Sequence, residues 1–125
     1  MTPRTLDALR SAVARVLRAR GEAADALVVV CNGQRVEIYV VACAMAGEWI
    51  DVTAPRRADA CAEAWAAVVR DLHYELRSAR ASVAGCRSDA TRDAARERLR
   101  RARAAVEAAQ AVEAQWLEDN GGGDR

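Results

Sequence analysis

The sequence has no lysine and no phenylalanine, only two prolines and one histidine, and no long uninterrupted apolar run. No segment approaches the ~20 apolar residues that cross a bilayer, and the first residues lack the apolar core of a secretory signal. We therefore expect a cytoplasmic protein without membrane contact. With 125 residues, it is expected to form one domain over residues 1–120, followed by a flexible glycine-rich tail at 121–125.

Chemical motifs are equally scarce. There is no glycine-rich phosphate loop, no Gly-x-Ser-x-Gly and no acidic calcium loop. The four cysteines, Cys31, Cys43, Cys61 and Cys86, are far apart and lack the close pairs of zinc sites, so free thiols are expected. His73 has Asp71 two residues before it, which points the two to different sides of a helix. The sequence predicts no enzyme, no metal and no cofactor.

The absence of lysine makes every basic side chain an arginine, whose planar fork suits carboxylates and phosphates; biased codon usage is the alternative explanation. The net charge of +1 argues against a dedicated nucleic-acid binder. The charges are nevertheless segregated, because the sign reverses after residue 103 to Glu107, Glu113, Glu118 and Asp119. Six arginines before that point are candidate contacts for nucleic acid or an acidic partner: Arg87, Arg92, Arg96, Arg98, Arg100 and Arg101.

Apolar residues recur at helical spacing in three segments. Residues 3–20 are predicted as a helix capped by Thr2 and ended by Gly21. Residues 55–118 are predicted as two long helices joined near Gly85, with Ser88 or Asp89 as the second N-cap. A short connection between long amphipathic helices indicates an antiparallel hairpin with a projecting tip. We expect cross-helix ion pairs there, Arg103 with Asp71 and Arg100 with Glu75, and a Glu97–Arg101 pair within one helix; Arg87, Arg92 and Arg98 have no obvious partner.

Residues 26–54 are predicted as a β-meander with turns at Asn32-Gly33 and Met45-Ala46-Gly47. These turns would place Val29 opposite Val36 and Val40 opposite Val52. Both faces of such a sheet are apolar, and large apolar patches are rarely left exposed. One face is therefore a candidate partner interface, made of Val28, Val30, Tyr39, Val41, Cys43 and Trp49.

These segments together predict an α+β fold of order α-β-β-β-α-α. A three-stranded antiparallel meander packs with an N-terminal helix and a long C-terminal antiparallel helical hairpin.

The order of elements over residues 3–83 resembles the double-stranded-RNA-binding domain, and Arg56 and Arg57 lie where that family places basic residues on phosphates. The sequence departs from that family in three ways: Asp59 and Glu63 follow at once, the strand-connecting loop is short, and the family has no long third helix. The resemblance implies RNA contact and is confined to topology.

The sequence favours a non-enzymatic protein-protein interaction protein, a small oligomeric adaptor or inhibitor of the kind that phages and other mobile elements encode. The mobile-element expectation comes from small size and absent motifs alone. A homodimer through the second sheet face or through the coiled-coil arms is the expected assembly, unless the protein's own helices cover both faces of the sheet. The alternative is an arginine-mediated DNA- or RNA-binding protein, whose affinity would fall steeply with salt.

Overall fold

The computed structural model describes the backbone of residues 3–21, 27–32, 35–41, 49–54 and 57–121, and the side chains of residues 3–21 and 58–119. Its helices are α1 (Leu6–Ala19), α2 (Arg57–Ala84) and α3 (Asp89–Gly121). Its strands are β1 (Leu27–Asn32), β2 (Arg35–Val41) and β3 (Trp49–Ala54).

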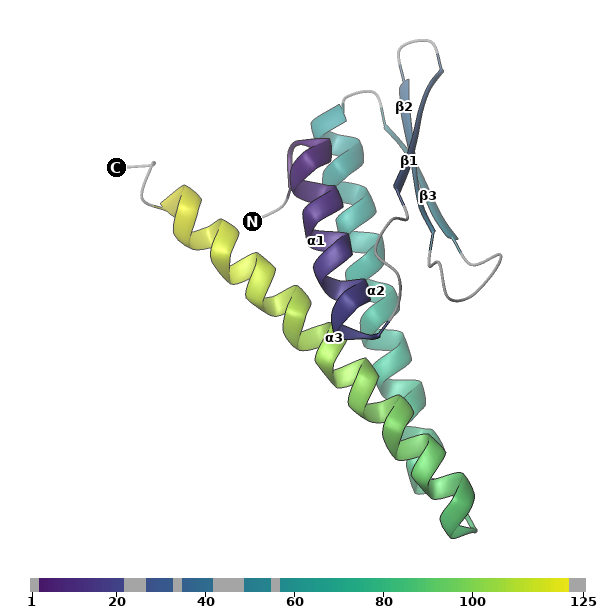
Figure 1. Cartoon of the computed structure of the whole chain (residues 1–125). Helices are drawn as coiled ribbons and strands as arrows, with labels where there is room; N and C mark the ends of the chain where they lie inside the picture. Colours follow the sequence, from purple (N-terminus) through teal and green to yellow (C-terminus); the bar gives the residue numbers. More distant parts are fainter. Residues whose placement is uncertain (1–2, 22–26, 33–34, 42–48, 55–56, 122–125) are drawn as a thin grey trace.

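The two long helices form the predicted antiparallel hairpin. At about 1.5 Å per residue, α2 and α3 are about 40 and 50 Å long. They converge at the connection between Ala84 and Asp89, which projects beyond α1 and the strands, and they diverge toward their other ends (Figure 1). Helix α1 packs against both α2 and α3 near the diverging ends.

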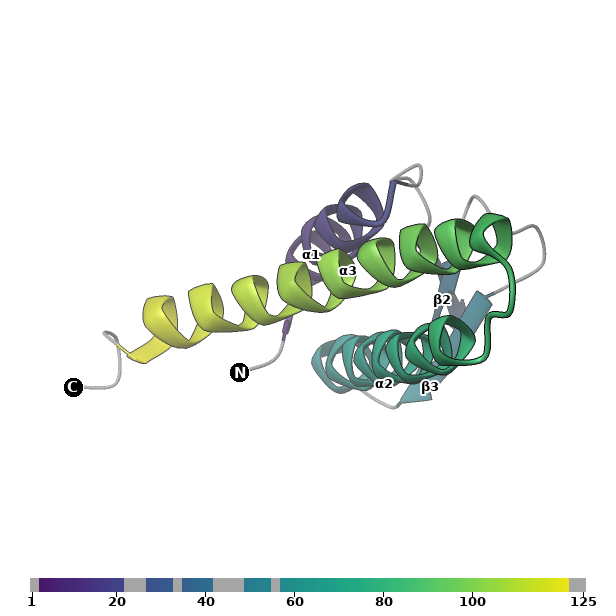
Figure 2. The ribbon, with the colours of Figure 1, turned by 90° about the horizontal axis from the view of Figure 1, so that it is seen from below.

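The strands lie beside α2 in the order β1-β2-β3, antiparallel throughout (Figures 1 and 2). Strands β2 and β3 both contact α2, and neither α1 nor α3 makes comparable contact with a strand in the described part of the chain. The N-terminal helix therefore packs on the hairpin and not on the sheet, contrary to the prediction.

The strand register differs from the predicted one by two residues. Val29 pairs with Ile38 instead of Val36, and Val40 pairs with Ile50 instead of Val52. A shift of two residues keeps each residue on its predicted face of the ladder, because faces alternate with every residue. The first hairpin closes at the Asn32–Arg35 pair, so Asn32 belongs to the strand. The predicted second turn and Pro55 lie outside the described residues.

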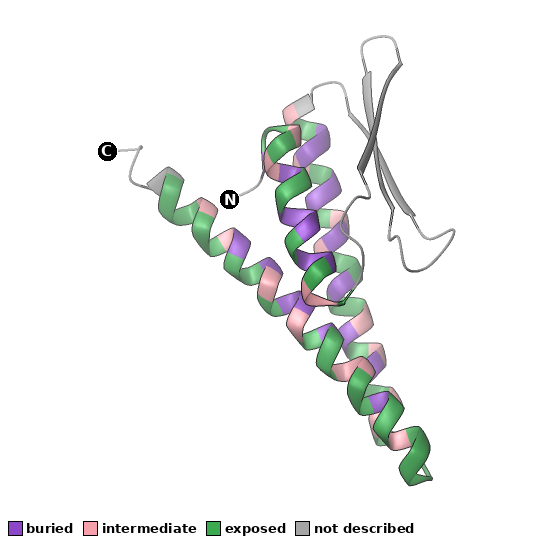
Figure 3. Cartoon of the chain, in the orientation of Figure 1, coloured by how far each residue is buried: buried purple, intermediate pink, exposed green. Residues whose placement is uncertain are grey.

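The prediction of an α+β domain built around a meander is corrected by the position of the core. Of the residues whose side chains are described, 89% are helical and none lies in a strand. Purple buried positions line the facing sides of the three helices in Figure 3. The part of the protein whose side chains are described is thus an all-helical assembly of a hairpin and a third helix. The apolar strands suggested a central sheet, but the helices also carry apolar stripes long enough to bury one another.

The core is one cluster that all three helices share. Helix α1 contributes Leu9, Val13, Val16 and Leu17. These residues form the apolar stripe predicted from their spacing, and all of them are buried. The helix begins later than expected, because Thr5, not Thr2, accepts a hydrogen bond from the Ala8 amide, and Gly21 ends it with a φ of 85° as expected.

Trp65 of α2 is the largest fully buried side chain described, with 1% of its surface exposed. Its ring meets that of Trp116 edge to face, with the centroids 5.1 Å apart. Its indole N–H donates to the Glu113 carboxylate at 3.2 Å, which satisfies the polar atom that burial would otherwise leave unpaired. Trp65 thereby joins α2 to the C-terminal half of α3.

We predict that Trp65→Ala lowers the free energy of unfolding by about 3–5 kcal/mol, because it removes a buried aromatic side chain and leaves a cavity. Urea unfolding followed by circular dichroism measures the change. The matched control is Tyr74→Ala, since Tyr74 is 64% exposed and its loss should change stability by less than about 0.5 kcal/mol. Equal losses in both variants would contradict the placement of Trp65 in the core.

Candidate functional site

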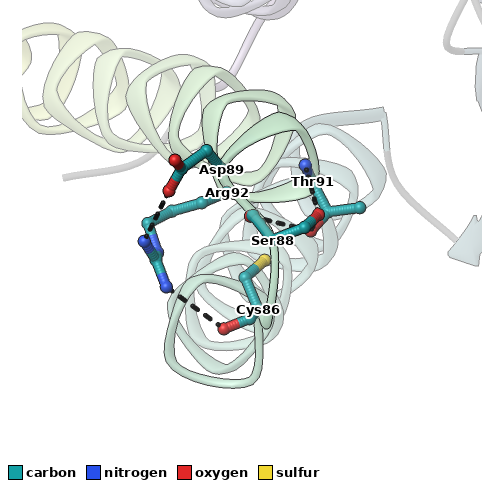
Figure 4. A network of polar contacts seen from close by, with 5 residues as sticks. All are labelled: Cys86, Ser88, Asp89, Thr91 and Arg92. Carbon is teal, nitrogen blue, oxygen red and sulfur yellow. Dashed lines mark hydrogen bonds and ion pairs between the residues drawn. The ribbon is translucent and has the colours of Figure 1, made fainter.

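The tip of the hairpin is held by a small polar network (Figure 4). Ser88 is the N-cap of α3, because its hydroxyl accepts from the Thr91 amide at 3.3 Å. Arg92 donates to the Asp89 carboxylate at 3.2 Å and to the Cys86 carbonyl at 3.5 Å, so it covers a carbonyl just beyond the end of α2. Arg92, predicted to lack a partner, is therefore engaged in closing the connection.

Arg98 links the two arms of the hairpin. Its guanidinium makes two hydrogen bonds to the Glu75 carboxylate, at 2.7 and 3.1 Å, and also donates to Ser78 and Ser82 at 3.0 and 2.9 Å. These acceptors lie on one side of α2, three or four residues apart. The hydrogen bonds to Glu75 raise the pKa of Arg98. Arg98, and not Arg100 as predicted, is the partner of Glu75, and its fork is used inside the protein.

Arg100 and Arg101 both pair with Glu97, one helical turn before them on α3. The predicted Glu97–Arg101 pair is present at 3.2 Å, and Arg100 adds a hydrogen bond of 3.0 Å from its Nε. The hydrogen bond from Arg100 and the positive charges of both arginines lower the pKa of the Glu97 carboxyl to about 2.

The remaining two candidate arginines, unlike the four above, have no partner in the described part of the chain. Arg87 and Arg96 are exposed and make no ion pair or hydrogen bond within the described part of the chain. Arg103 is also exposed and forms no ion pair with Asp71 there, contrary to the prediction. The structure does not gather the six candidates into one site, because Arg98 faces the other arm while Arg96 and Arg100 lie on the outside of α3.

A groove of about 510 Å³ runs along α3 near its middle. Val83 of α2 and Leu99 and Ala104 of α3 provide its apolar part, and charged side chains provide the rest. The full lining is Val83, Arg96, Leu99, Arg100, Arg103, Ala104 and Glu107. Apolar surface surrounded by arginines suits an apolar segment that carries acidic side chains.

The groove continues into a face of α3 that we call the outer stripe. Its members follow one another at intervals of three or four residues, which places them on one side of the helix. The side chains are exposed and lie roughly opposite the buried Ala102 and Ala105. The stripe consists of Arg96, Arg100, Arg103, Glu107, Ala111, Ala114 and Glu118.

The outer stripe was not predicted from the sequence as a site. Arg96 and Arg100 were candidates, but Arg103 was expected to be used in an ion pair. Leu99 is partly exposed and borders the groove. The sequence feature that could have indicated the stripe is the helical spacing of Arg96, Arg100 and Arg103 together with the change of charge sign at Glu107.

The predicted sheet interface lies largely outside the described side chains. The backbone register makes Val28 and Tyr39 Cα partners, and likewise Val41 and Trp49, and Val30 follows at the same parity. These five positions therefore have the same parity in the ladder. Cys43 lies outside the described residues.

The remaining candidate residues with described side chains are one histidine and two cysteines. His73 is exposed on α2, Cys61 is buried, and Cys86 donates its thiol to the Ser82 carbonyl at 3.0 Å. No cluster of three or more metal-ligating side chains occurs among the described residues. None of the helices in the described part of the chain has the length and apolar character needed to cross a membrane.

The chain matches no family model, no curated protein and no solved structure, so the topological resemblance to the double-stranded-RNA-binding domain gains no support from comparison.

We predict that Glu97 stays ionised down to about pH 2 and that Arg100→Ala raises its pKa toward 4.5. A carboxyl whose folded pKa is lowered stabilises the fold above its unfolded pKa, and this contribution is lost as the pH falls through about 2. Side-chain carboxyl NMR across an acid titration measures both values. Arg103→Ala is the control and should leave the titration of Glu97 in place; an equal shift in that variant would contradict the assigned pairing.

Proposed function

We propose that this protein is a non-enzymatic protein-binding protein, a small oligomeric adaptor or inhibitor that acts through the outside of α3. The observation that carries the proposal is the groove between Val83 and the outer stripe. It combines half-buried apolar side chains with arginines, and Arg96 and Arg103 have no ion-pair partner within the described part of the chain. Arginine beside apolar surface is typical of protein interfaces.

Binding of nucleic acid is the weaker candidate, because most of the predicted arginines are already paired. Arg92, Arg98, Arg100 and Arg101 all bind carboxylates of the protein itself. Contact with a phosphate would have to replace these bonds. Glu107 and Glu118 also lie on the same face of α3, where they would repel a phosphate backbone.

An enzymatic role has little support in the described side chains. General acid-base chemistry needs a titratable group oriented by a partner and placed next to a reacting atom. His73 is exposed and makes no hydrogen bond with the described residues, and the groove contains no nucleophile.

The test is photo-crosslinking from the groove. With p-benzoylphenylalanine in place of Ala104, irradiation of an extract of cells producing the protein should give an adduct that resists nuclease and is removed by protease. The same photoreactive residue in place of Arg77, which is exposed on α2 and outside the groove, is the control and should give little adduct.

The mass of the adduct separates the possible partners. An added mass equal to one further copy indicates self-association, and another protein mass indicates a foreign partner; both agree with protein binding. A nuclease-sensitive adduct would assign the groove to nucleic acid. No adduct at position 104, or equal adducts at both positions, would refute the proposed function.

A further inference from the structure

The outer stripe of α3 changes sign along its length. Its N-terminal part is basic, with Arg96, Arg100 and Arg103, while its C-terminal part carries Glu107 and Glu118 separated by alanines. Such a face is complementary to a reversed copy of itself. It is not complementary to a parallel copy, in which like charges would stand opposite each other.

We propose that the partner of the outer stripe is a second copy of this chain, bound with the two α3 helices antiparallel about a two-fold axis beside Ala105. This inference rests on the proposed protein-binding function and specifies its partner. With the axis there, Arg103 of each copy faces Glu107 of the other. Two-fold symmetry makes this contact twice.

The same register also matches side-chain size. Arg96 faces Ala114 of the second copy, which lies at the same angle around the helix, so a large side chain lies against a small one. The apolar part of the groove, Val83 and Leu99, then lies beside the partner helix. The register thus pairs Arg103 with Glu107 and places the groove beside the second copy.

The two charged residues of this contact, Arg103 and Glu107, can each take a partner from a second copy. Arg103 and Glu107 are both exposed, and neither makes an ion pair within the described part of the chain, although they are four residues apart on one helix. The outer stripe is exposed and faces away from the buried residues of α3, and Val83 of α2 borders it at the groove.

The size of the contact predicts a reversible dimer. Two helices that touch over about 40 Å, with a width of about 10 Å, bury about 400 Å² per copy and about 800 Å² in total, which is below the range for stable complexes and typical of weak, transient ones. The association should therefore depend on protein concentration. Because its central contacts are exposed ion pairs, it should also weaken with salt.

The test is sedimentation equilibrium of the purified, nucleic-acid-free protein over a range of concentrations. The unaltered protein should form a dimer. Arg103→Glu and Glu107→Arg should each weaken it by at least about tenfold, because either change makes both central contacts repulsive. Circular dichroism should show that both variants keep their helices.

Recombining the charges provides the decisive comparison. An equimolar mixture of the two variants should recover the dimer, because Glu at position 103 of one copy then faces Arg at position 107 of the other, and the reverse pair is unchanged. The variant that carries both substitutions should also dimerise alone. Arg77→Glu, on α2 and outside the stripe, is the charge-matched control and should have no effect.

Three outcomes would overturn this inference. The protein could be monomeric at every concentration, the mixture could fail to recover the dimer, or the dimer could survive Arg103→Glu and be lost in Val41→Glu, which would place it on the sheet. Each of these leaves the proposed function to be judged by crosslinking from Ala104, where a foreign protein adduct would keep protein binding and exclude the second copy.

Discussion

The contact between Trp65 and Trp116 sets the separation of α2 and α3 at the open end of the hairpin. Near the tip, several buried positions are small, Ala79 on one arm and Ala95 and Ala102 on the other, beside the buried Leu76, so the two backbones can approach closely. At the open end, two indole rings with centroids 5.1 Å apart occupy the seam. The arms must diverge there, and the divergence leaves apolar surface that a two-helix structure could not cover.

Helix α1 resolves this problem. Its buried residues Leu9, Val13, Val16 and Leu17 join the same cluster as Trp65, so the third helix completes the core where the hairpin opens. This explains why α1 packs on the hairpin and leaves the sheet to α2. It also explains the projecting tip, since close packing of alanines there needs no further element to exclude water.

The charged residues of α3 fall into two groups according to their position around the helix. Arg98 faces the other arm and is held by Glu75, Ser78 and Ser82, so its charge serves the hairpin. Arg103 lies on the opposite side and is exposed without an ion pair in the described part of the chain. A count of arginines along the sequence treats these two residues alike, and only their angle around the axis separates them.

Much of the helical structure could be predicted from the sequence, because it depends on local spacing and caps. The stripes that contain Leu9, Leu72 and Val106 repeat at helical intervals, and Gly21 ends its helix as glycine commonly does. The position of the core could not be predicted, because helices and strands here are both apolar, and spacing does not say which elements pack together. The partner of Glu75 depended on a difference of two residues, Arg98 against Arg100, which is finer than an antiparallel alignment by eye can resolve.

The reversal of sign on the outer stripe restricts what can bind along it. A phosphate backbone presents one sign over its whole length, so it would gain contacts at Arg96 and Arg103 and lose them at Glu107 and Glu118. A uniformly acidic protein segment has the same defect. A ligand that matches the whole stripe must itself change from acidic to basic over about the same distance and in the opposite direction. A second copy of α3, turned end to end, changes sign in that direction around Arg103 and Glu107, since it carries the same residues in reverse order.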